Sequence, residues 1–142
     1  MPLIPDSQID RLRRFFADTL EAPVQIRPLY TSDPDAPPEV LQQCQEAEAL
    51  LRELGSLSEL LSIEPITQER GVDEAWRPQL ILNSAVGGEL RYVGLPAGNE
   101  FPNFIRLVEM ISSRDSSLRP ETRRSLARVS APVHVRVFVT PT

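Results

Sequence analysis

Cysteine, lysine and long apolar runs are scarce or missing, and each shortage removes a class of protein. The single cysteine, Cys44, excludes an internal disulfide and a zinc site built from several thiolates. No apolar run approaches the roughly 20 residues that span a bilayer, so we expect no membrane partner. The first residues lack the basic region and the apolar stretch of a secretion signal. The expected location is therefore the cytoplasm.

Lysine is absent, and all 15 basic residues are arginine, against 20 acidic residues. The net charge of −5 argues against a nucleic-acid partner, because such binding depends on basic side chains that neutralise phosphates. The charge is uneven: residues 114–136 carry a net +4, which leaves −9 for the rest of the chain. Arg119, Arg123, Arg124 and Arg128 recur there at near-helical spacing. They are typical of a solvated helix face, with docking of an acidic partner as the alternative.

Motifs for several other chemistries are also missing. The sequence has no Gly-rich phosphate loop, no nucleophile elbow and no spacing typical of metal ligands. His134 is the only histidine, and no second type of metal ligand is arranged around it. We therefore expect neither a cofactor nor a metal site.

Hydrophobic periodicity predicts that helices and strands alternate along most of the chain. Apolar residues at helical spacing predict helices over residues 7–20 and 38–54. Short apolar runs predict strands over residues 24–30 and 60–66. Residues 79–93 are typical of a β-hairpin, because a glycine-containing turn separates two short apolar strands. At 142 residues the chain fits one domain that can bury a sizeable core.

The remainder of the chain is expected to add two helices and a strand. Apolar residues from Phe101 to Ile111 predict one helix, and a shorter helix is expected over residues 119–129. Valines alternate with other residues over 133–139, and this is the clearest strand pattern in the sequence.

The predicted order is a helix, a β-α-β unit, a β-β-α unit, and then a helix and a strand. Right-handed crossover makes the first two strands parallel, and the hairpin adds an antiparallel pair, so the sheet is mixed. A β-α-β unit followed by β-β-α resembles the thioredoxin fold. The predicted class is α/β: a mixed central sheet flanked by helices, with an extra N-terminal helix and a C-terminal helix–strand extension.

Two segments carry a closer resemblance. Residues 92–101, YVGLPAGNEF, resemble the "YxGLPAGxEF" segment of glutaredoxin-like protein disulfide oxidoreductases, which contain two thioredoxin units in tandem. Residues 133–142, VHVRVFVTPT, resemble the strand that opens their second unit and leads into a C-P-x-C motif. The resemblance implies an N-terminal thioredoxin-like unit over residues 1–113 and the start of a second unit over 114–142. The N-terminal domain of alkyl hydroperoxide reductase flavoproteins is a more distant resemblance.

The resemblance also locates a redox motif that is incomplete. The C-x-x-C of the family's first unit falls on residues 41–44, where Leu41 replaces the first cysteine and only Cys44 remains. The first thiolate attacks a substrate disulfide and the second resolves the mixed disulfide, so the dithiol cycle is lost here. Cys44 lies in an apolar stripe and is interpreted as an inert core thiol. The alternative is a thiolate whose pKa is lowered near a helix N-terminus, although Cys44 lies about two turns into the helix.

A proline site completes the candidate residues. Pro78 matches the proline that is cis in thioredoxin-fold proteins, and in the family the backbone before it pairs with an extended substrate chain. That backbone belongs here to Arg77. The neighbouring Trp76 is expected to be part of the core, with a peptide groove as the alternative.

Three functions remain open at this level. The first is a redox-inactive scaffold or peptide-binding module related to protein disulfide oxidoreductases. The second is a thiol-disulfide oxidoreductase of redox homeostasis that uses Cys44 alone. The third is a structural homo-oligomerisation domain. For that third function, the strand at 133–139 either extends the edge of its own sheet or pairs across a two-fold axis to form a homodimer.

Overall fold

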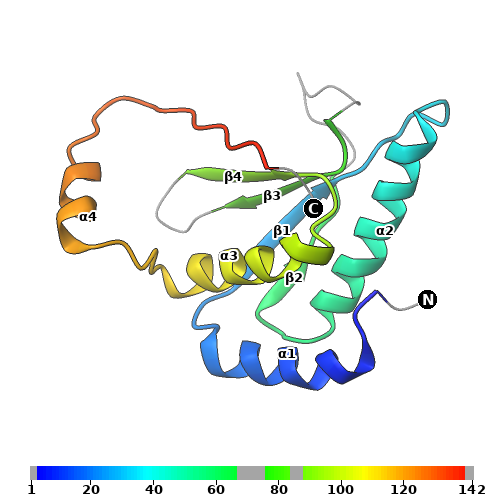
Figure 1. The fold of residues 1–142 in the computed structure, drawn as a ribbon, viewed down its shortest axis with the longest axis horizontal. Helices are drawn as coiled ribbons and strands as arrows, with labels where there is room; N and C mark the ends of the chain where they lie inside the picture. Colours follow the sequence, from blue (N-terminus) through cyan, green and yellow to red (C-terminus); the bar gives the residue numbers. More distant parts are fainter. Residues whose placement is uncertain (1–2, 67–75, 84–87, 140–142) are drawn as a thin grey trace.

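The computed structural model describes residues 3–66, 76–83 and 88–139, and Figure 1 shows their arrangement. Helices and strands alternate up to β2, the strands β3 and β4 come next, and helices make up the regular structure that follows. The elements in chain order are α1 (Asp6–Thr19), β1 (Val24–Leu29), α2 (Pro38–Gly55), β2 (Leu61–Ile63), β3 (Gln79–Asn83), β4 (Glu89–Val93), the short 3₁₀ turn η2 (Gly98–Glu100), α3 (Phe101–Ser113) and α4 (Pro120–Leu126). None of these helices is long and apolar enough to cross a bilayer.

The four strands form one mixed sheet in the order β2-β1-β3-β4. β1 and β2 are parallel, as the crossover through α2 requires, and the other two pairs are antiparallel. The predicted mixed sheet is therefore confirmed. β3 and β4 form the predicted antiparallel pair, while the connection between them, residues 84–87, lies outside the described residues.

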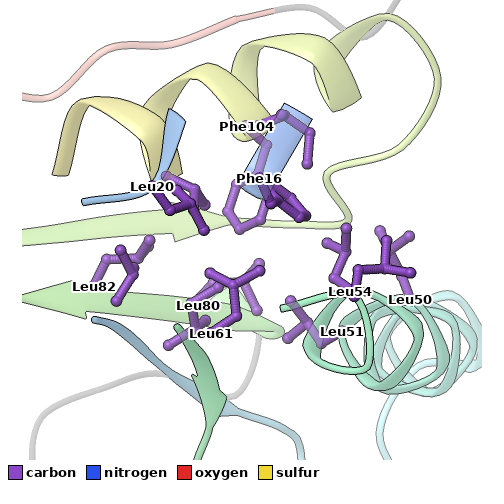
Figure 2. Packing of buried hydrophobic residues seen from close by; sticks show 14 of the residues in the cluster. Phe16, Leu20, Leu50, Leu51, Leu54, Leu61, Leu80, Leu82 and Phe104 are labelled. Carbon is purple, nitrogen blue, oxygen red and sulfur yellow. The ribbon is translucent and has the colours of Figure 1, made fainter. Parts of the chain in front are cut away.

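One face of the sheet forms the core. The register places Ile26 beside Leu82, and Leu80 lies between Pro28 and Tyr92, so alternate side chains point to the same side. Helices α1, α2 and α3 contribute apolar side chains to that side, as Figure 2 shows. The fully buried members include Phe16, Leu51, Leu54, Phe104 and Val108. Each such side chain stabilises the fold by about 1.5–3 kcal/mol relative to exposure.

A buried serine joins α3 to the segment between α1 and β1. The hydroxyl of Ser112 accepts hydrogen bonds from the backbone N–H groups of Glu21 and Ala22, at 2.9 and 3.0 Å. It also donates to the backbone oxygen of Ala22 at 2.6 Å. The serine side chain is 2% exposed and would lack a partner without these contacts, because water has little access to it. They fix where the chain enters β1 relative to α3.

The C-terminal part differs from the prediction. α4 ends at Leu126, three residues before the expected end at residue 129, and residues 133–139 form no strand. The expectation that this segment extends the edge of its own sheet is therefore wrong. Alternation favours a strand, but a strand forms only where a neighbouring strand supplies hydrogen bonds. The proposed boundary between residues 113 and 114 stays a prediction.

Candidate functional site

α2 places the remnant of the C-x-x-C motif. Pro37 caps the helix with φ −50°, Pro38 occupies its first turn, and Glu39 adds an acidic group where the helix dipole favours one. Leu41 is partly exposed, whereas Cys44 is only 6% exposed. The burial of Cys44 agrees with the interpretation of a core thiol, and its lack of reactivity stays a prediction.

The sulfur of Cys44 lies at the end of β1. The backbone N–H of Thr31 donates a hydrogen bond to its Sγ, with an N···S distance of 3.4 Å. Thioether and thiol sulfur atoms are weak acceptors, so this contact orients the side chain more than it stabilises a thiolate. The sulfur thus contacts the backbone that follows β1.

The side chain of Arg77 contacts the backbone next to Thr31. Its guanidinium Nη1 donates to the backbone oxygen of Tyr30 at 2.5 Å, and the residue is 6% exposed. The Arg77–Pro78 peptide bond is cis, as the resemblance implies. Tyr30 and Thr31 are consecutive, so Arg77 and Cys44 both bind the short stretch that follows β1. The structure therefore brings the predicted cysteine and proline sites together.

The GLPAG segment also contacts this site. The backbone N–H of Gly94 donates to the backbone oxygen of Pro78 at 2.8 Å. Gly94 has φ +108°, a conformation that L side chains rarely adopt, which explains the glycine at the end of β4. The residues that carry the sequence resemblance thus hold the proline loop against β4.

Tyr30 carries an ionisable group that interacts with the cysteine. Burial raises the pKa of its phenol well above the ordinary value, and the nearby Glu48 and Cys44 raise it further, while Arg52 opposes them. Glu48 and Arg52 form an ion pair at 3.0 Å one turn apart on α2. The phenol therefore stays protonated at physiological pH and is neither a base nor a thiolate-stabilising charge.

Trp76 is exposed, which corrects the expectation that it is part of the core. Its exposed fraction is 52%, directly beside the buried Arg77. The reason is local: the anchored arginine side chain fills the interior at this turn, and the preceding indole is left at the surface. A large exposed aromatic ring beside the proline loop fits the groove alternative.

The remaining candidates lie away from this site. The four arginines of the near-helical series are all exposed, as expected for a solvated face. Arg123 contacts Asp115 at 2.5 Å and Arg124 contacts Glu121 at 3.5 Å. His134 is exposed, and within the described part of the chain no three His, Cys, Asp or Glu side chains are grouped to hold a metal ion.

Sequence reasoning missed the two groups that connect the site, the carbonyl of Tyr30 and the N–H of Thr31. Both are backbone atoms, which every residue carries, so no residue type marks them. Their only signal is their position directly after a predicted parallel strand.

No known protein-family profile matches the chain, and no curated protein matches it. Solved structures do match. The alkylhydroperoxide reductase AhpF of Enterococcus faecalis is 19% identical, with a TM-score of 0.69, and the match covers 89% of this chain and 61% of that one. The isolated N-terminal domain of the same enterococcal protein is 20% identical, with a TM-score of 0.66 and coverage of 87% and 59%.

A protein disulfide oxidoreductase from Aeropyrum pernix is also similar, at 19% identity and a TM-score of 0.69 over 88% of this chain and 55% of that one. The chain thus spans less than two thirds of the length of each of these structures. At this identity the likeness concerns the fold. The chain is therefore an α/β protein with the thioredoxin-like fold that these structures share with it.

Proposed function

We propose that this chain is a redox-inactive thioredoxin-like domain, related to protein disulfide oxidoreductases, that acts as a scaffold or a peptide-binding module. The observation that carries the proposal is the state of the C-x-x-C position. Leu41 stands where the attacking cysteine is required, and Cys44, the one thiol in the chain, is buried. Disulfide exchange needs an accessible thiolate to attack and a second thiol to resolve the mixed disulfide.

The surroundings of Cys44 also favour an inert thiol. Reactive cysteines sit in electropositive, partly exposed places, commonly at a helix N-terminus. Cys44 lies seven residues beyond the N-cap Pro37, and the benefit of the helix dipole fades within the first turn. Its Sγ faces the Thr31 amide rather than solvent.

The peptide-binding part of the proposal rests on the proline loop. The resemblance implies that an extended chain pairs with the backbone at Arg77, and the exposed ring of Trp76 lies next to it. The Arg77 side chain binds the Tyr30 carbonyl, so it is a positioning residue that holds the loop. Trp76 then supplies the apolar contact to the bound chain.

The redox half of the proposal is tested by the reduction of insulin disulfides with dithiothreitol. We expect the chain to leave the uncatalysed rate unchanged, and Cys44→Ala to behave like the wild type. Turnover clearly above that rate, abolished by Cys44→Ala, would instead support the oxidoreductase of redox homeostasis that uses Cys44 alone. Rapid labelling of native Cys44 at neutral pH would point the same way.

A gain-of-function variant sharpens this test. Leu41→Cys restores C-x-x-C spacing on α2, and the matched double variant Leu41→Cys with Cys44→Ala keeps the new thiol but removes the pair. We expect only the single substitution to form an internal disulfide. If the wild type already reduced insulin as fast as Leu41→Cys, the missing cysteine would not explain the function.

Peptide binding is tested through the only tryptophan, Trp76, whose fluorescence reports on the loop. The probe is reduced and carboxymethylated insulin B chain, an extended peptide without free thiols. We expect a saturable change in Trp76 emission that Arg77→Ala weakens and the exposed control Arg124→Ala does not. If Trp76 emission does not change at millimolar peptide, the peptide-binding role is wrong and only the scaffold role remains.

The proposed location is the cytoplasm, where a lone thiol stays reduced.

A further inference from the structure

The segment after α3 differs in exposure from the rest of the molecule. We call residues 114–139 the C-terminal arm; Figure 1 shows it running out to α4 and back, beside the sheet and helices. Its final part is apolar yet exposed by between 59% and 80%, at Val133, Val135, Val137, Phe138 and Val139. A run of large apolar side chains in water is typical of an interaction surface.

Contacts at the base of the arm set its direction. α3 ends at Ser113, its C-cap residue Arg114 has a left-handed φ of 58°, and Ser117 has φ 57°. Arg106 of α3 donates to the Ser117 hydroxyl at 3.0 Å, and Arg123 of α4 donates to Asp115. These contacts fix the first part of the arm, and the valine segment that follows is exposed and forms no strand.

The sheet offers a matching edge. Among the described residues β4 is the last strand of the sheet, and Leu90 and Val93 on it are 42% and 47% exposed. An edge strand with apolar side chains and unpaired backbone groups is a template for another strand. β2 at the opposite edge has only three residues, so β4 is the longer template.

Side-chain alternation and charge both suit this pairing. If the arm lies beside β4 as a strand, the register that buries its valines places them on the side of Leu90 and Tyr92, which continues the core face. His134, Arg136 and Phe138 then fall on the side of Glu89 and Arg91, which form an ion pair at 2.6 Å. Residues 114–136 carry +4 and the rest of the chain −9, so the arm and the body attract each other.

We infer that two copies of this chain exchange C-terminal arms, residues 133–139 of each copy adding a fifth strand beside β4 of the other. The arrangement is a two-fold homodimer with identical interfaces. The partner is a second copy because the arm and the edge that fits it belong to the same sequence and carry opposite net charge, while among the described residues the arm pairs with no strand of its own chain. The inference concerns the arm alone and does not depend on the proposed redox inactivity.

Sedimentation equilibrium of the full chain is the direct test. At tens of micromolar we expect a species of twice the chain mass of 15.9 kDa. The affinity between the two copies should fall as salt is raised, because salt screens the attraction between their charges. A monomer at hundreds of micromolar would overturn the inference. The arm would then pair with something other than a second copy of this chain.

Two variants locate the contact. Leu90→Lys places a charge at the β4 edge, and the pair Val135→Asp with Val137→Asp places charges in the arm. We expect each to weaken dimerisation by at least about tenfold, equivalent to about 1.4 kcal/mol. The control Leu126→Lys changes a comparably exposed leucine of α4, 54% exposed, and leaves the dimer intact. Circular dichroism is the check that all three variants are folded.

Mixing the two variants separates arm exchange from other dimers. The Leu90→Lys chain keeps a usable arm, and the double-aspartate chain keeps a usable edge. An equimolar mixture is expected to form a heterodimer through the intact arm and the intact edge, more tightly than either variant dimerises alone. If the mixture stays monomeric, or if the two variants dimerise like the wild type, the arms are not exchanged.

Discussion

The body of the molecule, residues 3–113, and the C-terminal arm use similar apolar patterns with opposite results. Phe104, Ile105 and Val108 follow helical spacing on α3 and are buried against the sheet. The valines of the arm follow a strand pattern at least as regular, yet all of them are exposed. The comparison teaches that periodicity states which face of an element is apolar, whereas burial depends on whether another surface is placed to cover it.

The largest effect is expected where the body is most tightly packed. Phe104→Ala removes a fully buried ring that also meets Tyr92 edge to face, with centroids 5.6 Å apart. We expect the free energy of unfolding to fall by about 3–5 kcal/mol, measured by urea titration. A loss as small as that of an exposed residue would mean that the core is not formed by this face.

Ser112→Ala tests the polar part of the same core. The substitution leaves the backbone N–H groups of Glu21 and Ala22 and the Ala22 carbonyl without their hydroxyl partner. We expect a loss of about 1–3 kcal/mol, because three part-buried hydrogen bonds are removed together. Ser113→Ala, one residue along and less buried, is the matched control and is expected to cost clearly less.

Cys44→Ala tests whether the remaining cysteine acts as a core residue. Removing the sulfur leaves a small cavity beside Thr31, and we expect a loss of about 1–2 kcal/mol in thermal or urea unfolding. A variant as stable as the wild type would contradict the buried assignment and return attention to a reactive thiol.

High pH distinguishes the two tyrosines from ordinary surface tyrosines. Burial raises the pKa of Tyr30 and Tyr92 above the ordinary value of 10.0. The phenols of the unfolded chain therefore lose their protons at a lower pH than those of the folded chain. Their contribution to the free energy of unfolding is fully present below pH 10 and is lost as the pH rises above it. Native phenolate absorbance is expected to develop above pH 10, and Tyr30→Phe reduces the loss of stability there. Phenolate formation at pH 10 in the folded protein would show that both rings are solvated.

The smallest effect is expected in the arm. Val135 is 74% exposed, so Val135→Ala in dilute, monomeric protein changes the free energy of unfolding by less than about 0.5 kcal/mol. If arms are exchanged at higher concentration, the same substitution is expected to lower the midpoint of thermal unfolding there. A large effect in the monomer would show that the arm packs on its own body and would remove the contrast between the two regions.

Much of the fold could be predicted from the sequence because its signals are local. Pro38 and Gly55 bound α2, and the apolar spacing inside it matches the buried face. The mixed sheet followed from the order of elements, since a crossover helix allows only a parallel pair. The same local reasoning failed for Trp76, because its exposure depends on the direction of the neighbouring Arg77 side chain.

The sequence by itself determined the chemistry that is missing and the identity of the elements that form. One cysteine excludes an internal disulfide whatever the fold, and a charge of −5 argues against a nucleic-acid partner. Only the tertiary structure decided that Cys44 and Arg77 bind adjacent backbone groups, and that the valine arm lies outside its own sheet. The physical reason is that hydrogen bonds and burial are properties of pairs of surfaces, and residues 33 positions apart in the sequence become neighbours only through the folded chain.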